Sequence, residues 1–123
     1  MSVTFNNTKL LSNLKRQSLR LAKHLEMPQN QVQMLLAKHF YNEKSLADIK
    51  RKINSNNYSG MIFLAAVEPD ADENVLDKFI EALPQLLIEL SSSPISQIIK
   101  VTTKQLIIDV FSLKPSFFLD NDQ

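Results

Sequence analysis

Apolar residues recur at helical spacing near the start of the chain, and this periodicity constrains the fold more than any other feature. Between residues 8 and 27, one side of the expected helix is made by Leu11, Leu14, Leu21, Ala22 and Leu25. Pro28 interrupts the pattern, because a proline disfavours a helical conformation in the residue before it and suits the first turn of a new helix. We therefore predict one helix over residues 8–27 and a second over residues 28–40.

A short third helix is expected after these two. The stretch that begins at Ser45 has the spacing of a weak capping box, which marks a helix start. Leu46, Ile49 and Ile53 then recur at helical spacing. The polar residues 54–57 end this helical region.

The second part of the chain contains three short apolar runs that are typical of strands. Residues 61–67 form a run that is closed by a Glu-Pro-Asp turn, which suits a strand buried on both faces. Residues 98–103 and 106–111 are rich in β-branched side chains and indicate a hairpin. Between the first and the second of these three runs, a broad apolar face over residues 75–90 predicts a helix that Pro84 should kink or divide.

These patterns together predict an α+β fold. The length and a hydrophobic fraction of 44% suit one core, so we expect a single domain over residues 1–123. Its front half (residues 1–57) would hold three helices. Its back half (residues 58–123) would be β-α-β-β, with a small sheet containing antiparallel strands. Residues 95–104 fit either a strand or a helix, and the sequence leaves that choice open.

The charges are divided unevenly between the two halves. The front half holds ten lysines and arginines against three acidic residues, a net charge of +7. The back half holds four lysines against ten acidic residues, a net charge of −6. Such a division suggests that the basic half meets a polyanion or an acidic partner, or that the halves attract each other within or between chains.

Several classes of enzyme are excluded by the residues that the chain lacks. Without cysteine there is no disulfide, thiolate zinc site or thiol catalysis. The single glycine, Gly60, rules out glycine-rich phosphate loops and nucleophile elbows. His24 and His39 have no further ligands at metal-binding spacing near them. We therefore expect neither catalytic activity nor a cofactor or bound metal. The alternative is an enzyme whose scattered residues form no linear motif, with His24 or His39 beside carboxylates in a polar pocket.

The lengths of the apolar runs also indicate whether the protein is exported or inserted into a membrane. The longest of them, residues 61–67, is far shorter than the roughly 20 residues of a membrane span. The first twenty residues carry no continuous apolar segment of the kind found in signal peptides. We expect neither export nor membrane insertion, and the absence of cysteine suits the cytoplasm.

One local pattern is similar to a known motif. Residues 18–37 resemble the core of a helix-turn-helix DNA-binding motif, in which a small residue of the first helix packs against a buried aliphatic residue of the second. The residues that match in type and spacing are Ala22, Leu25, Met27, Val32 and Leu35.

The resemblance implies that the helix starting at residue 28 is a recognition helix in the major groove, where amide side chains pair with adenine. The residues it places there are Gln29, Asn30, Gln31 and Gln33. Phosphate contacts would come from Arg16, Arg20, Lys23 and Lys38. On this hypothesis the chain is a small, non-enzymatic regulatory or accessory protein that associates with DNA.

Two other interpretations of the same helices stay open. Any compact three-helix unit needs a small residue at a close crossing and aliphatic residues at these spacings, so the pattern also fits a structural role. Alternatively, the basic helices dock on an acidic or amphipathic protein, and the chain is an adaptor or inhibitor that binds no nucleic acid.

The sequence also predicts a homodimer. Three strands would leave open sheet edges, and Phe117, Phe118 and Leu119 form an apolar tail near them. Pairing across a two-fold axis would cover both surfaces.

Overall fold

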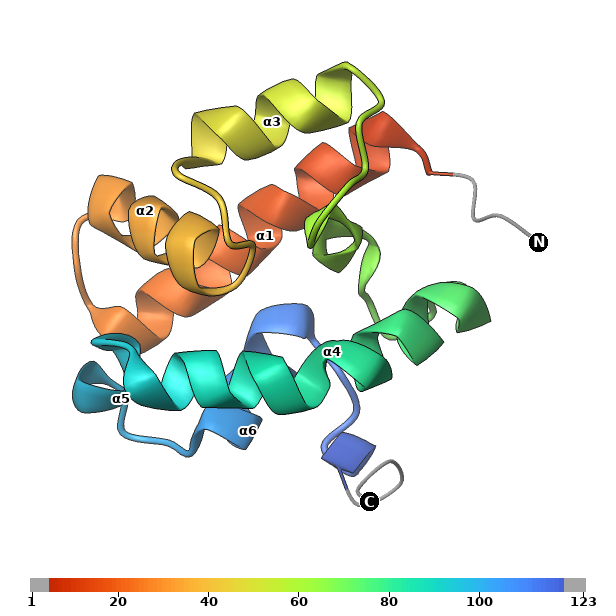
Figure 1. Ribbon diagram of the computed structural model, residues 1–123. Helices are drawn as coiled ribbons and strands as arrows, with labels where there is room; N and C mark the ends of the chain where they lie inside the picture. The colour runs from red at the N-terminus through yellow and green to blue at the C-terminus, as the bar shows by residue number, and fades with distance from the viewer. Residues whose placement is uncertain (1–4, 119–123) are drawn as a thin grey trace.

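The computed structural model describes residues 5–118, and every regular element within that range is helical (Figure 1). The elements are α1 (Asn7–Leu25), α2 (Gln29–His39), α3 (Leu46–Asn54), the 3₁₀ helix η1 (Ile62–Ala66), α4 (Glu73–Ser92), α5 (Ile95–Ile98) and α6 (Thr103–Phe111). The prediction of an α+β fold with a β-α-β-β back half is wrong, because none of the described residues belongs to a strand.

The three helices of the front half are confirmed, and side chains cap two of them. The Asn6 Oδ1 atom accepts a hydrogen bond from the backbone N–H of Lys9 at 3.2 Å, at the start of α1. The Ser45 Oγ atom accepts one from the backbone N–H of Asp48 at 3.2 Å, at the start of α3. Each bond satisfies a backbone donor that the first turn of a helix leaves without a partner.

The apolar run over residues 61–67 forms η1 instead of the predicted strand. Two amide side chains of α1 bind its backbone. Asn13 Nδ2 donates to the carbonyl of Ala65 at 2.9 Å, and Gln17 Nε2 donates to the carbonyl of Leu64 at 2.9 Å. These buried carbonyls therefore find their partners on a helix and need no neighbouring strand.

The predicted hairpin is replaced by a loop followed by helix α6. Residues 98–103 run from the last residue of α5 through a loop to the first residue of α6, and residues 106–111 lie within α6. The Thr102 Oγ1 atom accepts from the backbone N–H of Gln105 at 3.1 Å and so caps α6. Burial of β-branched residues in the core outweighs their strand preference here, since that preference mainly reflects packing.

Helix α4 continues through Pro84 without dividing. Its N-terminus is capped by Asp72, whose Oδ1 atom accepts from the backbone N–H of Asn74 at 2.8 Å. Pro84 is exposed, while Phe79 before it and Leu86 after it are buried. Packing on both sides of the proline therefore offsets the backbone hydrogen bond that proline cannot make.

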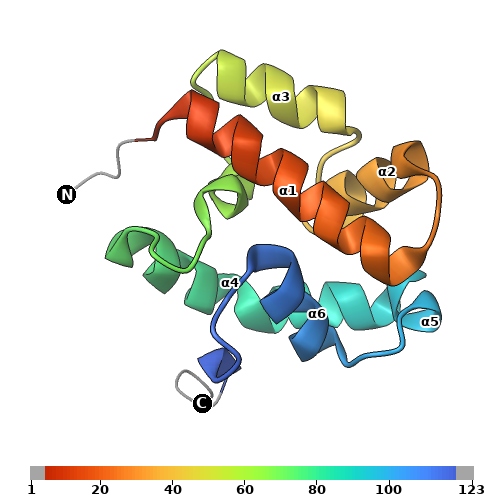
Figure 2. The same cartoon turned by 180° about the vertical axis from the view of Figure 1, so that it is seen from behind.

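Helix α1 passes through the middle of the molecule, with α2 and α3 on one side and α4, α5 and α6 on the other (Figures 1 and 2). Residues of both halves share one buried apolar cluster. None of the helices described within residues 5–118 combines the length and the apolar character that a membrane crossing requires.

The homodimer prediction relied on open sheet edges and an exposed apolar tail, and the described residues provide neither. No sheet edge exists among the described residues. Phe117 is only 8% exposed and packs on Phe79, with 5.9 Å between ring centroids, while Leu119 lies outside the described residues. The phenylalanine tail thus covers the chain's own core, and a homodimer needs another interface.

Candidate functional site

The segment that resembles a helix-turn-helix motif forms two helices joined by a short turn. Helix α1 ends at Leu25 and α2 begins at Gln29. Glu26 takes a left-handed backbone conformation, with φ of 52° and ψ of 46°, and its N–H donates to the carbonyl of Ala22 at 2.9 Å. The turn over residues 26–28 therefore contains a residue at positive φ, where the motif usually has glycine.

Replacing this residue with glycine should stabilise the protein. A left-handed conformation costs a residue with a Cβ atom roughly 1–2 kcal/mol, and the extra freedom of glycine in the unfolded chain offsets part of that gain. We expect Glu26→Gly to raise the free energy of unfolding by about 0.5–1 kcal/mol, measured by urea denaturation. Glu26→Gln removes the same charge and keeps the strained backbone, so an equal gain in that control would contradict the backbone explanation.

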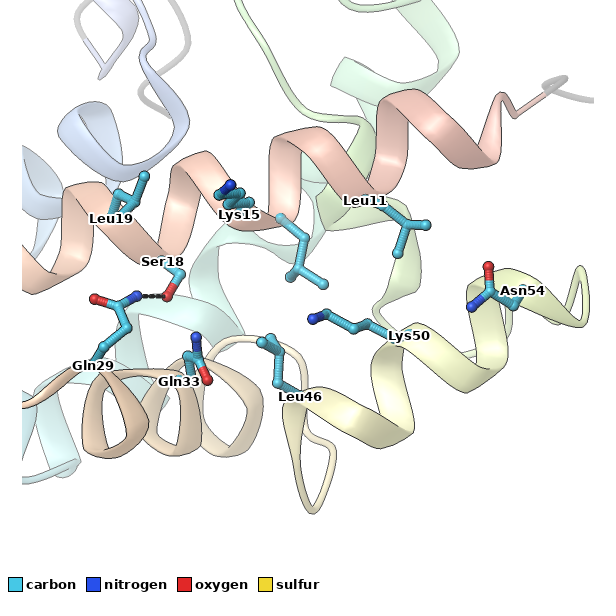
Figure 3. A pocket seen from close by; sticks show the side chains of 10 residues that line it. Leu11, Lys15, Ser18, Leu19, Gln29, Gln33, Leu46, Lys50 and Asn54 are labelled. Carbon is cyan, nitrogen blue, oxygen red and sulfur yellow. Dashed lines mark hydrogen bonds between the residues drawn. The ribbon is translucent and has the colours of Figure 1, made fainter.

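The four predicted base-reading amides of α2 do not share one face. Asn30 and Gln31 are exposed to solvent. Gln29 and Gln33 are half-buried and point from α2 towards α1 (Figure 3). The Nε2 atom of Gln29 donates to the Ser18 Oγ atom at 2.6 Å. The structure therefore brings only two of the four amides to the outer surface of α2.

The predicted phosphate contacts also divide into two groups. Arg16, Lys23 and Lys38 are exposed, and within residues 5–118 none of them has an ion-pair partner. Arg20 is half-buried, and its Nη1 atom donates to the carbonyl of Val110 in the last turn of α6 at 3.1 Å. A cation suits the C-terminal end of a helix, so Arg20 ties α1 to α6.

Most lysine and arginine side chains of α1 and α2 have no carboxylate partner among the described residues. Neither helix contains an acidic residue, and Glu26 in the turn is the one carboxylate between residues 7 and 39. Carboxylates from outside the two helices reach them at one lysine and two histidines. Lys9 contacts Glu68 at 3.2 Å, while His24 contacts Asp109 and His39 contacts Glu89, both at 2.9 Å. Most of the positive surface is thus left to solvent.

A groove between α1, α2 and α3, here called the interhelix groove, has a volume of about 530 Å³ (Figure 3). It is lined by Leu11, Leu14, Lys15, Ser18 and Leu19 of α1, Gln29 and Gln33 of α2, and Leu46, Lys50 and Asn54 of α3. It combines aliphatic side chains with two lysines and several amides.

Sequence reasoning missed this groove, although a signal was present. Leu11 and Lys15 stand four residues apart on α1, and Leu46 and Lys50 stand four residues apart on α3. Residues four apart lie on the same side of a helix, so each pair forms a Leu-Lys line. The two lines face the groove from different helices, which only the packing of α3 against α1 reveals.

Within residues 5–118, no group of three histidine, aspartate or glutamate side chains is arranged to hold a metal ion. Comparisons with models of protein families, with curated proteins and with solved structures find no match to this chain. Its function must therefore be argued from its own residues.

Proposed function

We propose that the protein is a small accessory or regulatory protein that binds duplex DNA through α1 and the outer surface of α2. One observation carries the proposal: Arg16, Lys23 and Lys38 are exposed and lack ion-pair partners within residues 5–118, on two helices without an acidic residue. Exposed positive charges without a carboxylate partner favour a ligand that carries many negative charges, such as a phosphate backbone.

The proposal assigns DNA contacts to fewer residues than the sequence pattern predicted. Arg16, Lys23 and Lys38 contact phosphates, while Arg20 keeps its bond to α6. Asn30 and Gln31 lie near the N-terminus of α2 and contact base edges. No side chain caps that N-terminus among the described residues, so its first backbone N–H groups are available to a phosphate.

Salt dependence tests the proposal directly. Three phosphate contacts predict that the binding constant falls by about 40-fold between about 50 and about 200 mM salt, because each neutralised phosphate contributes about −0.9 to the logarithmic slope. Fluorescence anisotropy with a labelled duplex measures this. Absence of binding at the lower salt concentration contradicts the proposal.

A pair of matched variants locates the interface. Arg16→Gln with Lys23→Gln removes two charges from α1 and should make the slope shallower by about 1.8. Lys100→Gln with Lys114→Gln removes the same charge from exposed positions of the back half and should leave the slope unchanged. Equal losses in both variants would mean that only net charge matters and that α1 is not the binding surface.

A further inference from the structure

The interhelix groove is not used by the proposed DNA contacts, and its chemistry fits a different partner. Leu14 is fully buried, while Leu19 is 48% exposed at the rim. Lys15 and Lys50 come from different helices, are exposed, and have no ion-pair partner in the part of the chain that the structure describes. Such a groove suits a helix that presents aliphatic and acidic side chains together.

The chain itself carries a helix of that kind. Asp77, Glu81 and Ile88 of α4 fall on one side of the helix, since their spacings of four and seven residues match the helical period. The two acidic residues are exposed and have no ion-pair partner among the described residues. Ile88 is 60% exposed, more than any other large apolar side chain described.

We propose that the interhelix groove binds α4 of a second copy of this chain, in a symmetric dimer that forms this contact twice. The α4 helix of the same chain cannot occupy the groove, because it lies on the opposite side of the molecule from α3 (Figures 1 and 2). Lys15 and Lys50 then face Asp77 and Glu81 of the second copy. The basic half of each chain meets the acidic half of the other, and Ile88 gains an apolar partner.

The mass of the protein in solution gives the first test. Sedimentation at high micromolar concentration and low salt should yield twice the chain mass of 14.1 kDa. Added salt should shift the mass towards that of one chain, because exposed charges at the contact are screened. A monomer at low salt overturns the proposal.

A reciprocal charge reversal gives the sharper test. One variant carries Lys15→Glu and Lys50→Glu, and the other carries Asp77→Lys and Glu81→Lys. Each variant alone places like charges at both contacts, so its dimer should weaken by at least about a hundredfold. In an equal mixture, both contacts of the mixed dimer pair opposite charges, and dimers should return. Circular dichroism confirms that each variant is folded.

The controls separate this inference from the proposed function. Arg16→Glu with Lys23→Glu reverses two exposed charges of α1 outside the groove lining. It should abolish DNA binding and leave the dimer intact. Dimers that persist in either groove or α4 variant mean that another surface pairs. A mixture that stays monomeric means that α4 is not the occupant, and either result overturns the inference.

Discussion

Phe111→Ala should lower the free energy of unfolding by about 3–5 kcal/mol, since it removes an aromatic side chain from the centre of the core. Phe111 is fully buried. Its ring centroid lies 5.1 Å from that of Phe79 on α4 and 6.0 Å from that of Phe40, which follows α2. Three parts of the chain therefore lose contacts together, and the cavity that remains cannot be filled by a single shift.

Urea denaturation measures the effect as a lower midpoint at an unchanged slope. Met34→Ala is the matched control, because Met34 is 54% exposed and its truncation should change the free energy of unfolding by no more than about 0.5 kcal/mol. A cost for Phe111→Ala as small as that of the control would show that α6 is not packed in the core as the structure has it.

Phe111 belongs to a segment that is buried almost throughout. Such burial explains why the helices of the front half could be predicted from the sequence and the elements of the back half could not. Helix α1 keeps one side exposed although other helices pack on it, so its buried and exposed residues follow the helical period, and a strand cannot produce that pattern. Residues 61–67 and 106–111 are buried almost throughout, so they lack the alternation that separates a helix from a strand. One local pattern does indicate a helix at α6: Thr102 and Gln105 have the spacing of a capping box, which marks a helix start.

The candidate site shows the same limit. Helical periodicity alone places Arg16 and Lys23 on the outer side of α1, and the structure has them exposed. Gln33 faces the interhelix groove and not open solvent, because α1 and α3 pack on that side of α2. The sequence of α2 alone does not say which of its sides they cover. Arg20 binds a carbonyl ninety residues away in sequence, and no local pattern points to such a contact.

The other large effect is expected at alkaline pH, and it originates at a buried tyrosine. Tyr41 is fully buried, and its hydroxyl donates to the Gln17 Oε1 atom at 2.5 Å. Burial raises the pKa of the Tyr41 hydroxyl far above its ordinary value, and the hydrogen bond to Gln17 lowers it by less. The native protein therefore keeps this proton at pH values where the unfolded chain releases it.

The sign of the pH dependence follows from proton counting. Below the ordinary tyrosine pKa of about 10, both states hold the proton and stability does not depend on Tyr41. Above it, the unfolded state binds fewer protons than the native state, so raising the pH favours unfolding. The free energy of unfolding should fall by about 1.4 kcal/mol for each pH unit above about 10, until the native tyrosine also ionises.

Urea denaturation between about pH 9 and about pH 12 tests this, with tyrosinate absorbance to follow ionisation. Tyr41→Phe should remove this contribution to the slope, although its stability near neutral pH is lower because Gln17 loses a donor. Tyr58→Phe removes the other tyrosine hydroxyl and should retain the contribution of Tyr41. If Tyr41→Phe has the same alkaline slope as the unchanged protein, then Tyr41 is not the group that links folding to pH. The bond from Tyr41 to Gln17 also orients Gln17 towards the Leu64 carbonyl, so the same variant should loosen η1 against α1.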